Sequence, residues 1–593
     1  MRKNKLRYMV VCFILAVMFL DNTTVLGNDA IWFTDLRKCT PDSALREISR
    51  KKRWRAIEYE STEVSGVLVS AGPDAPDLTL DLGLEGWHAV YVGLWCREKA
   101  RLKLTDEPCF QRLKWVKRPG RGDTLEDAFF QYANLSGQNL IVAADGRGPF
   151  GGPPATSSLA YVRCEPLPDE KVAEILRERE WNDGYRKLIA TNDGNCCTYI
   201  RTKTHVREYI EGYRHSDVGT LYWGIHGELA GYPTKLGHDM RLFQSKGFTP
   251  AEIDLFRNGF NPYKIALDYA HSIGLKFFVY QRMGAFGSIP PFKSGEIFYD
   301  EQLETRTFKT HPEWRCIDKE GRTMLCLSYA YPGFRKVAIS ILREAAEFGV
   351  DGVNLQFKRG APFVMYEPPL VKGFKNETGL DARELDEWDE RWLRYRSRSL
   401  TEFLRELREE LNQVGNQLGK RLEISASSFP AENENLFYGL DLETWIEEGL
   451  VDTLAPMGIS HSSGEVELDY YARLTQGTQC KFYPFLRAGL DRSGNRRPHT
   501  PANYRDSAVK AYQAGADGLT IWDEFSVHYR SPYFGLRRLG HVNELKRGPV
   551  QTVPERHVIK LFSLGGHDLR YTHVPSDYKR IYKQMHDYWY NPL

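Results

Sequence analysis

The stretch GVDGVNLQFKRG, residues 349–360, decides the fold of this chain. It follows a long helical pattern over residues 332–348, and its first glycine can end that helix in the left-handed conformation. A short apolar run comes next, and polar residues from Gln356 onward stand where a strand would end. In a barrel of parallel strands, the carboxyl ends of the strands collect the reacting groups. The stretch therefore predicts one β/α unit of a barrel, with functional side chains at its C-terminal end.

The joint from helix to strand recurs along the chain. FGVDGV at 348–353 has counterparts in AGADGL at 514–519 and EGLVDT at 448–453, and HSIGLK at 271–276 is a looser copy. Strand-like runs alternate with helical patterns, and the eight predicted strands cover residues 187–192, 219–223, 276–280, 353–357, 421–425, 453–456, 481–487 and 518–522. This repetition predicts a TIM (β/α)8 barrel. A doubly wound open sheet is the alternative, although no glycine-rich nucleotide fingerprint follows any of the runs.

The length of 593 residues is enough for two or three domains. Short strand-like runs separated by Gly, Pro and Asp predict an all-β, sandwich-like domain over residues 28–168. A charged helical connector is expected at 169–186, and the barrel at 187–540. The tyrosine-rich residues 541–593 are expected to cap the barrel. An all-β domain in this position can bind carbohydrate or shield the barrel, and the sequence leaves both roles open.

Residues 1–27 have the pattern of a cleavable secretory signal peptide. A basic start precedes an apolar run at 8–20, which is too short to span a bilayer. We therefore expect a secreted or periplasmic protein without stable membrane insertion. Of the 10 cysteines, Cys12 lies in the leader, so the mature chain has an odd number and at least one thiol without an intramolecular partner. None of the spacings resembles a zinc site, and we expect the cysteines to be structural.

The composition narrows the class of function. With 80 basic and 78 acidic side chains, nothing indicates a nucleic acid or an anionic membrane as partner. The sequence has no nucleophile elbow, zinc-binding helix or phosphate loop, so no metal or cofactor is expected. Polar, aromatic and acidic residues after the strands favour acid/base chemistry on a hydroxyl-rich carbohydrate, which usually needs two carboxylates. The sequence does not determine the oligomeric state.

Three carboxylates that follow predicted strands are the candidate catalytic groups. Asp523 comes directly after the eighth strand, while Glu228 and Glu367 lie in loops after the second and fourth strands. Each of them can instead form a salt bridge, cap a helix or face solvent. The candidate substrate-binding residues share the same position after strands, and they are Trp223, His226, Arg282, Gln356, Arg359, Arg487 and Trp522. Convergent arginines would suit an acidic or sulfated sugar, or a partner carboxylate within the protein.

An ordered set of motifs resembles the family-10-like glycosyl hydrolase group. The motifs are WG at 223–224, HPEW at 311–314 with DKEG at 318–321, LSYAYP at 327–332, DGVNLQFKR at 351–359, GLDLETW at 439–445 and GLVD at 449–452. The resemblance covers about residues 185–530 and implies a secreted bacterial TIM barrel that cleaves glycosidic bonds. Relatives commonly have an Asp where this chain has Gln356, and Arg487 ends the seventh strand where a catalytic Glu would be expected.

The resulting hypothesis is a secreted glycoside hydrolase that acts on a poly- or oligosaccharide through paired carboxylates. A carbohydrate-binding protein on a degenerate barrel is one alternative, and Gln356 is the main argument for it. A polysaccharide lyase that uses Tyr, His or Arg is another. Neither the sugar and its linkage nor the stereochemistry of cleavage follows from the sequence.

Overall fold

The structure is a computed structural model of the chain. It describes residues 30–46, 52–72, 75–95, 99–114, 123–144, 157–180, 184–192, 202–225, 227–239, 250–284, 286, 305–358, 360–458, 465–486, 501–522, 538–545 and 557–569. The predicted leader at 1–27 lies outside these ranges. Within them, no helix has the length and apolar character needed to cross a membrane.

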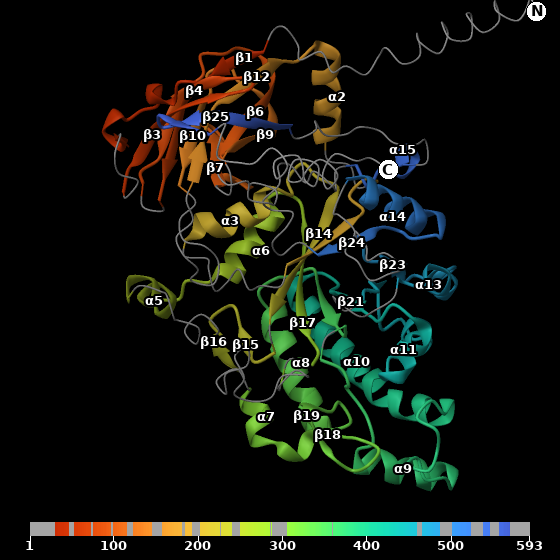
Figure 1. Cartoon of the computed structure of the whole chain (residues 1–593). Helices are drawn as coiled ribbons and strands as arrows, with labels where there is room; N and C mark the ends of the chain where they lie inside the picture. Colours follow the sequence, from red (N-terminus) through yellow and green to blue (C-terminus); the bar gives the residue numbers. More distant parts are fainter. Residues whose placement is uncertain are drawn as a thin grey trace, which may run out of the picture.

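Eight parallel strands form one sheet of the structure (Figure 1). In spatial order they are β24 (Leu519–Trp522), β13 (Leu188–Asn192), β14 (Val218–Ile225), β17 (Lys276–Arg282), β20 (Gly352–Gln356), β21 (Glu423–Ser427), β22 (Thr453–Leu454) and β23 (Lys481–Phe482). A bridge from Phe485 to Thr520 joins the two ends of this order, with the Leu486 amide 2.7 Å from the Thr520 carbonyl oxygen. The sheet is therefore closed, which confirms the predicted barrel.

Helices connect the strands on the outside of the barrel. Between successive strands lie α3 (Lys203–Glu211), α6 (Pro262–Ser272), α8 (Pro332–Ala346), α10 (Glu390–Leu418), α12 (Leu442–Glu447), α13 (Leu468–Thr475) and α14 (Pro501–Gln513). Shorter elements fill the loops, namely β15 (Leu229–Ala230), β16 (His238–Asp239), α5 (Pro250–Arg257), α7 (Arg306–Thr310), β18 (Arg315–Ile317), β19 (Thr323–Leu327), α9 (Pro368–Thr378), α11 (Glu432–Phe437) and α15 (Val542–Leu545). Long loops after β17 and β20 match the expected design, in which the C-terminal end of the barrel carries the insertions.

Side chains alternate between the helical layer and the interior of the barrel. On β17, Phe277 and Val279 belong to the large core cluster between strands and helices, whereas Phe278 and Tyr280 belong to a separate small cluster. That small cluster also contains residues of other strands, namely Ile189, Tyr222 and Tyr483. Because successive residues of a strand point to opposite faces, the small cluster is the packed interior of the barrel.

Asp351, in the GVDG motif, links two neighbouring strands at the N-terminal end of the barrel. Its amide donates to the Phe277 carbonyl oxygen at 2.9 Å, and its Oδ2 accepts from the Phe277 amide at 2.8 Å. Oδ2 also lies 2.8 Å from His271 Nε2, and Lys420 Nζ donates to Oδ1 at 2.7 Å. Burial alone would raise the pKa of Asp351, but the hydrogen bonds from these partners outweigh it and lower the pKa to about 2.

The same contact recurs at the other two close copies of the motif. Asp452 exchanges backbone and side-chain hydrogen bonds with Ile424, the second residue of β21, at 2.7 Å for both its amide and its Oδ2. Asp517 does the same with Phe482, the second residue of β23, at 2.9 Å for both contacts. In all three copies a glycine with positive φ ends the preceding helix, at +104° for Gly349. We call Asp351, Asp452 and Asp517 the aspartate clamps.

The all-β part of the chain forms one curled sheet of 14 strands. Its strands are β1 (Ile31–Phe33), β2 (Leu45–Arg46), β3 (Trp54–Ser61), β4 (Ser65–Ala71), β5 (Leu78–Asp81), β6 (Trp87–Trp95), β7 (Lys99–Leu104), β8 (Gln111–Lys114), β9 (Thr124–Asn134), β10 (Asn139–Ala143), β11 (Ser157–Leu159), β12 (Val162–Pro166), β25 (His557–Leu564) and β26 (His567–Asp568). Side chains from both halves of the sheet share one core, as in a sandwich. Strand pairing continues from one half to the other through β25, so the halves are not two separate sheets.

The position of β25 corrects our expectation for the tail. We expected residues 541–593 to cap the barrel, but β25 pairs antiparallel with β9 and β3 of the all-β domain. Ile559 and Leu561 are fully buried there, in a cluster with Tyr59, Leu68 and other side chains of that domain. The edges of β9 and β3 expose backbone groups that can pair with a further strand, and β25 of the tail forms this pairing. Only α15, which contacts α14, stays with the barrel among the described tail residues.

The all-β domain sits against the N-terminal end of the barrel (Figure 1). Arg101 of β7 forms a buried ion pair with Glu208 of α3, and Cys109 Sγ lies 3.3 Å from the hydroxyl of Tyr269 on α6. The connector α2 (Asp169–Arg179) adds a second junction, since its Glu178 pairs with Arg538 after β24. These contacts leave the C-terminal ends of the strands on the other side of the barrel.

The aspartate clamps lead to a prediction about acid stability. Because the folded-state pKa of Asp351 is about 2, below the ordinary 3.8, its contribution is present above pH 4 and is lost as the pH falls toward 2. Asp351→Asn should lower the free energy of unfolding by about 1–3 kcal/mol at pH 7, and by less at pH 2. Urea unfolding at both pH values measures this. Asp268→Asn, on the exposed face of α6, is the control, and an equal loss in both variants would contradict the prediction.

A second prediction concerns β25. Ile559→Ala and Leu561→Ala each remove a fully buried side chain, so each should lower the free energy of unfolding of the all-β domain by about 2–5 kcal/mol. Ser563→Ala, a half-buried position on the same strand, should change it by less than about 0.5 kcal/mol. Limited proteolysis in urea, followed by identification of the fragments, reports on this domain. Unchanged resistance in both core variants would show that the tail strand is dispensable.

Candidate active site

A network of polar side chains lies inside the barrel. The Tyr222 hydroxyl donates to Ser425 Oγ at 2.7 Å, which connects β14 with β21 across the interior because these strands are not neighbours in the sheet. Asn354 Nδ2 donates to Ser425 Oγ at 3.0 Å and to Ser427 Oγ at 3.2 Å. All four side chains are buried. The interior of the barrel is thus filled by aromatic and aliphatic side chains in one part, and by hydrogen-bonded amides and hydroxyls toward the C-terminal ends of the strands.

Gln356 is the outermost member of this network on β20. Its Nε2 donates to Asn354 Oδ1 at 2.8 Å, while its Oε1 is buried and has no hydrogen-bond partner among the described residues. Leaving a buried acceptor unused costs about 1–3 kcal/mol, so such a group usually serves a purpose. Gln356 therefore offers an oriented acceptor at the end of a strand, as a ligand hydroxyl would need. No observation tests whether Gln356 binds substrate, so this role remains a prediction.

Cationic side chains accompany Gln356. Arg282 ends β17 and is paired in register with Gln356, and Lys358 follows two residues later with only 7% of its surface exposed. Lys358 lies in the turn that directly follows β20. This side of the barrel mouth therefore carries positive charge next to a neutral amide.

Trp223 does not belong to the mouth. It is 1% exposed and lies in the cluster between strands and helices, with its ring centroid 6.1 Å from that of Phe277. The alternation along β14 turns Trp223 outward while Tyr222 points into the barrel, so this geometry gives no support to its predicted role in substrate binding.

Glu228 is also enclosed. Its carboxylate accepts hydrogen bonds from the amide of Thr307, at 3.0 Å, and from the hydroxyl of the same residue. Thr307 lies in the first turn of α7, where backbone amides lack partners within the helix. Glu228 is 5% exposed, so it holds α7 in place and does not face the mouth as we expected.

Glu367 has a comparable structural role. It is the residue before α9, its oxygens accept from the Met365 amide at 2.9 and 3.1 Å, and it is fully buried. Burial raises the pKa of its carboxyl group, although hydrogen bonds from Met365, Ser328 and Cys316 act against this. A carboxylate without exposed surface cannot meet a polysaccharide, so the expectation of a catalytic role is not supported by this geometry.

The other predicted site residues lie mostly outside the described part of the chain. These are Asp523, His226, Arg359 and Arg487. Trp522 is the last residue of β24, and only its place in that strand is described. Their roles therefore remain predictions.

Glu434 is a carboxylate that the sequence did not single out as catalytic. It lies on α11, directly after β21, and thus at the C-terminal end of the barrel. The side chain is half-buried, and its Oε2 is enclosed without a hydrogen-bond partner in the described part of the chain. Desolvation, together with the charge of Glu467, raises its pKa. A partly exposed carboxyl group that holds its proton to higher pH has the properties of a general acid.

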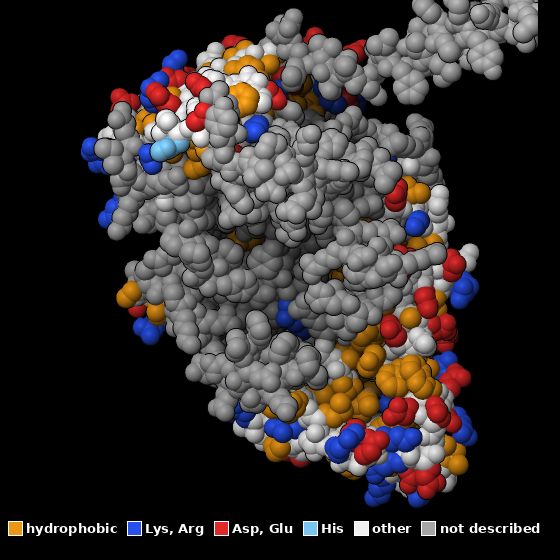
Figure 2. Space-filling view, viewed as in Figure 1, with side chains coloured by type: hydrophobic (Ala, Val, Ile, Leu, Met, Phe, Trp, Pro, Cys, Tyr) orange, Lys and Arg blue, Asp and Glu red, His pale blue; other side chains and the backbone are white. Residues whose placement is uncertain are grey.

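An aromatic surface lies beside Glu434. Phe437 and Tyr438 follow it on the same helix by three and four residues, so they share its face. Trp388 is 52% exposed, and its ring centroid lies 4.4 Å from that of Phe437. Figure 2 shows hydrophobic side chains gathered on the lower part of the face, between charged groups. An exposed tryptophan next to a carboxylate can stack on the C–H face of a sugar ring.

No group of three or more His, Cys, Asp or Glu in the described ranges is arranged to hold a metal ion. The described cysteines, at 39, 109, 164, 316, 326 and 480, are all buried free thiols.

Comparison with models of known families gives no match, and comparison with curated proteins gives none. Among solved structures, the catalytic domain of a β-amylase from Paenibacillus polymyxa shares 11% identity, with a TM-score of 0.40, over 61% of this chain and 99% of that chain. An α-galactosidase from Thermus thermophilus shares 12% identity, with a TM-score of 0.33, over 87% and 99%. The chitinase ChiW from a Paenibacillus species shares 11%, with a TM-score of 0.34, over 79% and 57%. The assignment of the barrel rests on its strand pairing and not on these likenesses.

The burial of Glu434 gives a test that needs no substrate. Because its pKa is raised on folding, the charged form is disfavoured in the folded protein, and this cost is present at pH 7 and absent at pH 3. Glu434→Gln should therefore raise the melting temperature at pH 7 and leave it unchanged at pH 3. Glu432→Gln, at an exposed position of the same helix, should have no effect at either pH. Destabilisation by Glu434→Gln at pH 7 would contradict the prediction.

Proposed function

We propose that this protein is an exported glycoside hydrolase that cleaves a poly- or oligosaccharide at the C-terminal end of its barrel. The observation that carries the proposal is the polar network in the barrel, which ends in the unused acceptor Gln356 Oε1. Neutral amides and hydroxyls with fixed orientation recognise a ligand by its hydroxyl groups. The resemblance of residues 185–530 to the family-10-like glycosyl hydrolase group supports the same class of substrate.

The acid in this proposal is Glu434. As the bond between the anomeric carbon and the glycosidic oxygen breaks, its proton passes to that oxygen, so that the leaving sugar departs as an alcohol. The second carboxylate is Asp523 at the end of the eighth strand. It either removes a proton from the attacking water or attacks the anomeric carbon itself. Trp388 and Phe437 support the sugar ring, and Gln356 accepts a hydrogen bond from one of its hydroxyls.

The positive charge beside Gln356 narrows the expected substrates. Arg282 is paired in register with Gln356, and Lys358 follows Gln356 by two residues along the chain. A sugar that carries a carboxylate or sulfate would gain charge-assisted hydrogen bonds from such cations. Uronic-acid polymers and sulfated galactans therefore belong in any screen, together with neutral glucans and chitin fragments.

Screening for released reducing ends tests the proposal. The purified protein should release them from at least one of these glycans, and both Glu434→Gln and Asp523→Asn should lower kcat by about 10²–10⁴-fold. Glu432→Gln should stay within about twofold of the unaltered protein, because its side chain is exposed beyond the aromatic surface. The raised pKa of Glu434 predicts that activity falls on the alkaline side of the pH profile, and that this fall disappears in Glu434→Gln measured on an activated aryl glycoside.

One observation favours a second function, a carbohydrate-binding protein without catalysis. Two of the three carboxylates predicted from the sequence, Glu228 and Glu367, are structural. Binding of a glycan that is never cleaved, with loss of binding in Trp388→Ala, would establish this alternative. Unsaturated products that absorb in the ultraviolet would instead establish a lyase, and either result would overturn the hydrolase.

A further inference from the structure

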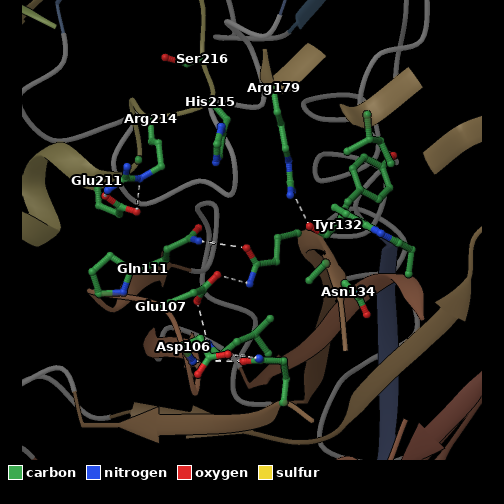
Figure 3. Close-up of a pocket in the computed structure, with 18 of the residues that line it drawn as sticks. Asp106, Glu107, Gln111, Tyr132, Asn134, Arg179, Glu211, Arg214, His215 and Ser216 are labelled. Carbon is green, nitrogen blue, oxygen red and sulfur yellow. Dashed lines mark hydrogen bonds and ion pairs between the residues drawn. The ribbon is translucent and has the colours of Figure 1, made fainter. Parts of the chain in front are cut away.

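A cavity of about 430 Å³ lies between the all-β domain and the barrel (Figure 3). Residues of β6 and β9, the loop after β7, the connector α2 and the segment between α3 and β14 line it. Ser216, on its wall, precedes β14 by two residues, so the cavity is at the N-terminal end of the barrel. It is therefore separate from the candidate active site. Its size falls within the range of about 300–1,000 Å³ that is usual for small-molecule sites.

One side of the cavity is aromatic. Trp87 of β6 and Tyr132 of β9 are half-buried, and the buried ring of Phe129 lies 4.7 Å from that of Tyr132. The guanidinium of Arg179 lies 5.1 Å from the centre of the Trp87 ring and donates to the Tyr132 carbonyl oxygen at 2.5 Å. Rings with partly exposed faces suit the apolar face of a flat ligand.

Amides and a carboxylate form another side. Glu107 accepts from the Leu104 amide and from Gln131 Nε2, both at 2.7 Å, and Gln111 Nε2 donates to Gln131 Oε1 at 3.3 Å. Figure 3 shows this chain facing Arg214 and His215 across the cavity. Its members are half-buried, so the hydrogen bonds fix their orientation while part of each side chain still borders the space.

The two arginines that line the cavity are held by acceptors in its wall. Arg214 Nε donates to Glu211 at 2.8 Å, and Arg179 is held by Tyr132. Desolvation, together with Arg179, Arg214 and Arg186, lowers the pKa of His215 to about 4, so its ring is neutral near pH 7 and can both donate and accept. An anionic ligand would have to compete with Glu211 for Arg214 and with the Tyr132 carbonyl oxygen for Arg179, whereas a neutral ligand with hydroxyl groups would not.

We propose that this cavity is a second carbohydrate site, which binds a neutral disaccharide between the aromatic side and the Glu107–Gln131–Gln111 chain. The ligand would contact both domains, so binding would stabilise their junction. This site does not depend on catalysis at the barrel mouth, and it can exist even if the proposed hydrolase activity does not.

Calorimetric titration of the full chain with cellobiose, maltose, lactose and N,N′-diacetylchitobiose tests the proposal. The Glu434→Gln background prevents consumption of the sugar. At least one disaccharide should bind, and Trp87→Ala and Gln111→Ala should each weaken its binding by about tenfold or more, since an aromatic or hydrogen-bonding contact is lost. Trp32→Ala, which removes an exposed ring of the same domain outside the cavity, should change affinity by less than about twofold.

The titrations distinguish binding in this cavity from binding at the C-terminal end of the barrel. Binding that is lost in Trp87→Ala and Gln111→Ala but retained in Trp388→Ala supports the proposal. Binding that is lost only in Trp388→Ala places the sugar at the mouth and overturns it, as does the absence of binding by all four disaccharides. Reducing-end release by Trp87→Ala and Gln111→Ala in the unaltered Glu434 background reports on the hydrolase separately, so either idea can fail without the other.

Discussion

Three aspartates hold the strands of the barrel in register, and the positions of the functional groups depend on this register. Each clamp binds both the amide and the carbonyl of the second residue in the preceding strand, through its own carboxylate and its own amide. A shift of one residue would turn every inward side chain outward. The clamps therefore decide that Tyr222, Asn354 and Gln356 meet inside the barrel and that Trp223 does not.

The N-terminal end of the barrel therefore carries the structural contacts, and its C-terminal end carries the candidate functional groups. The clamps, the all-β domain and the connector all gather at the N-terminal end, where Arg101 and Glu208 form a buried pair. This leaves the C-terminal end to the long loops, and a carboxylate can there remain partly exposed and poorly paired, as Glu434 is. The junction also encloses a cavity with its own aromatic and amide walls, because two curved surfaces do not fit without a gap.

The carboxylates show why the position of a residue after a strand does not by itself make it catalytic. Glu228, Glu367 and Glu434 all follow strands, yet the first two satisfy backbone amides at the start of a helix or turn. The amide donor for Glu367 comes from its own loop, and the donor for Glu228 comes from the loop after β17. Within the described ranges Glu434 has no such donor for Oε2, and desolvation raises its pKa. Only the paths of the loops distinguish these cases.

The sequence by itself determined the barrel, since eight apolar runs and three Gly-x-Asp or Gly-x-x-Asp joints are local patterns that repeat. It also indicated Gln356 as a binding group, because the residue ends a buried strand. Tertiary structure alone decided that the tail supplies β25 to a distant sheet, that Glu228 and Glu367 are enclosed, and that Trp388 lies against Phe437. These features depend on contacts between segments far apart in the chain, and local periodicity contains no information about which segments meet.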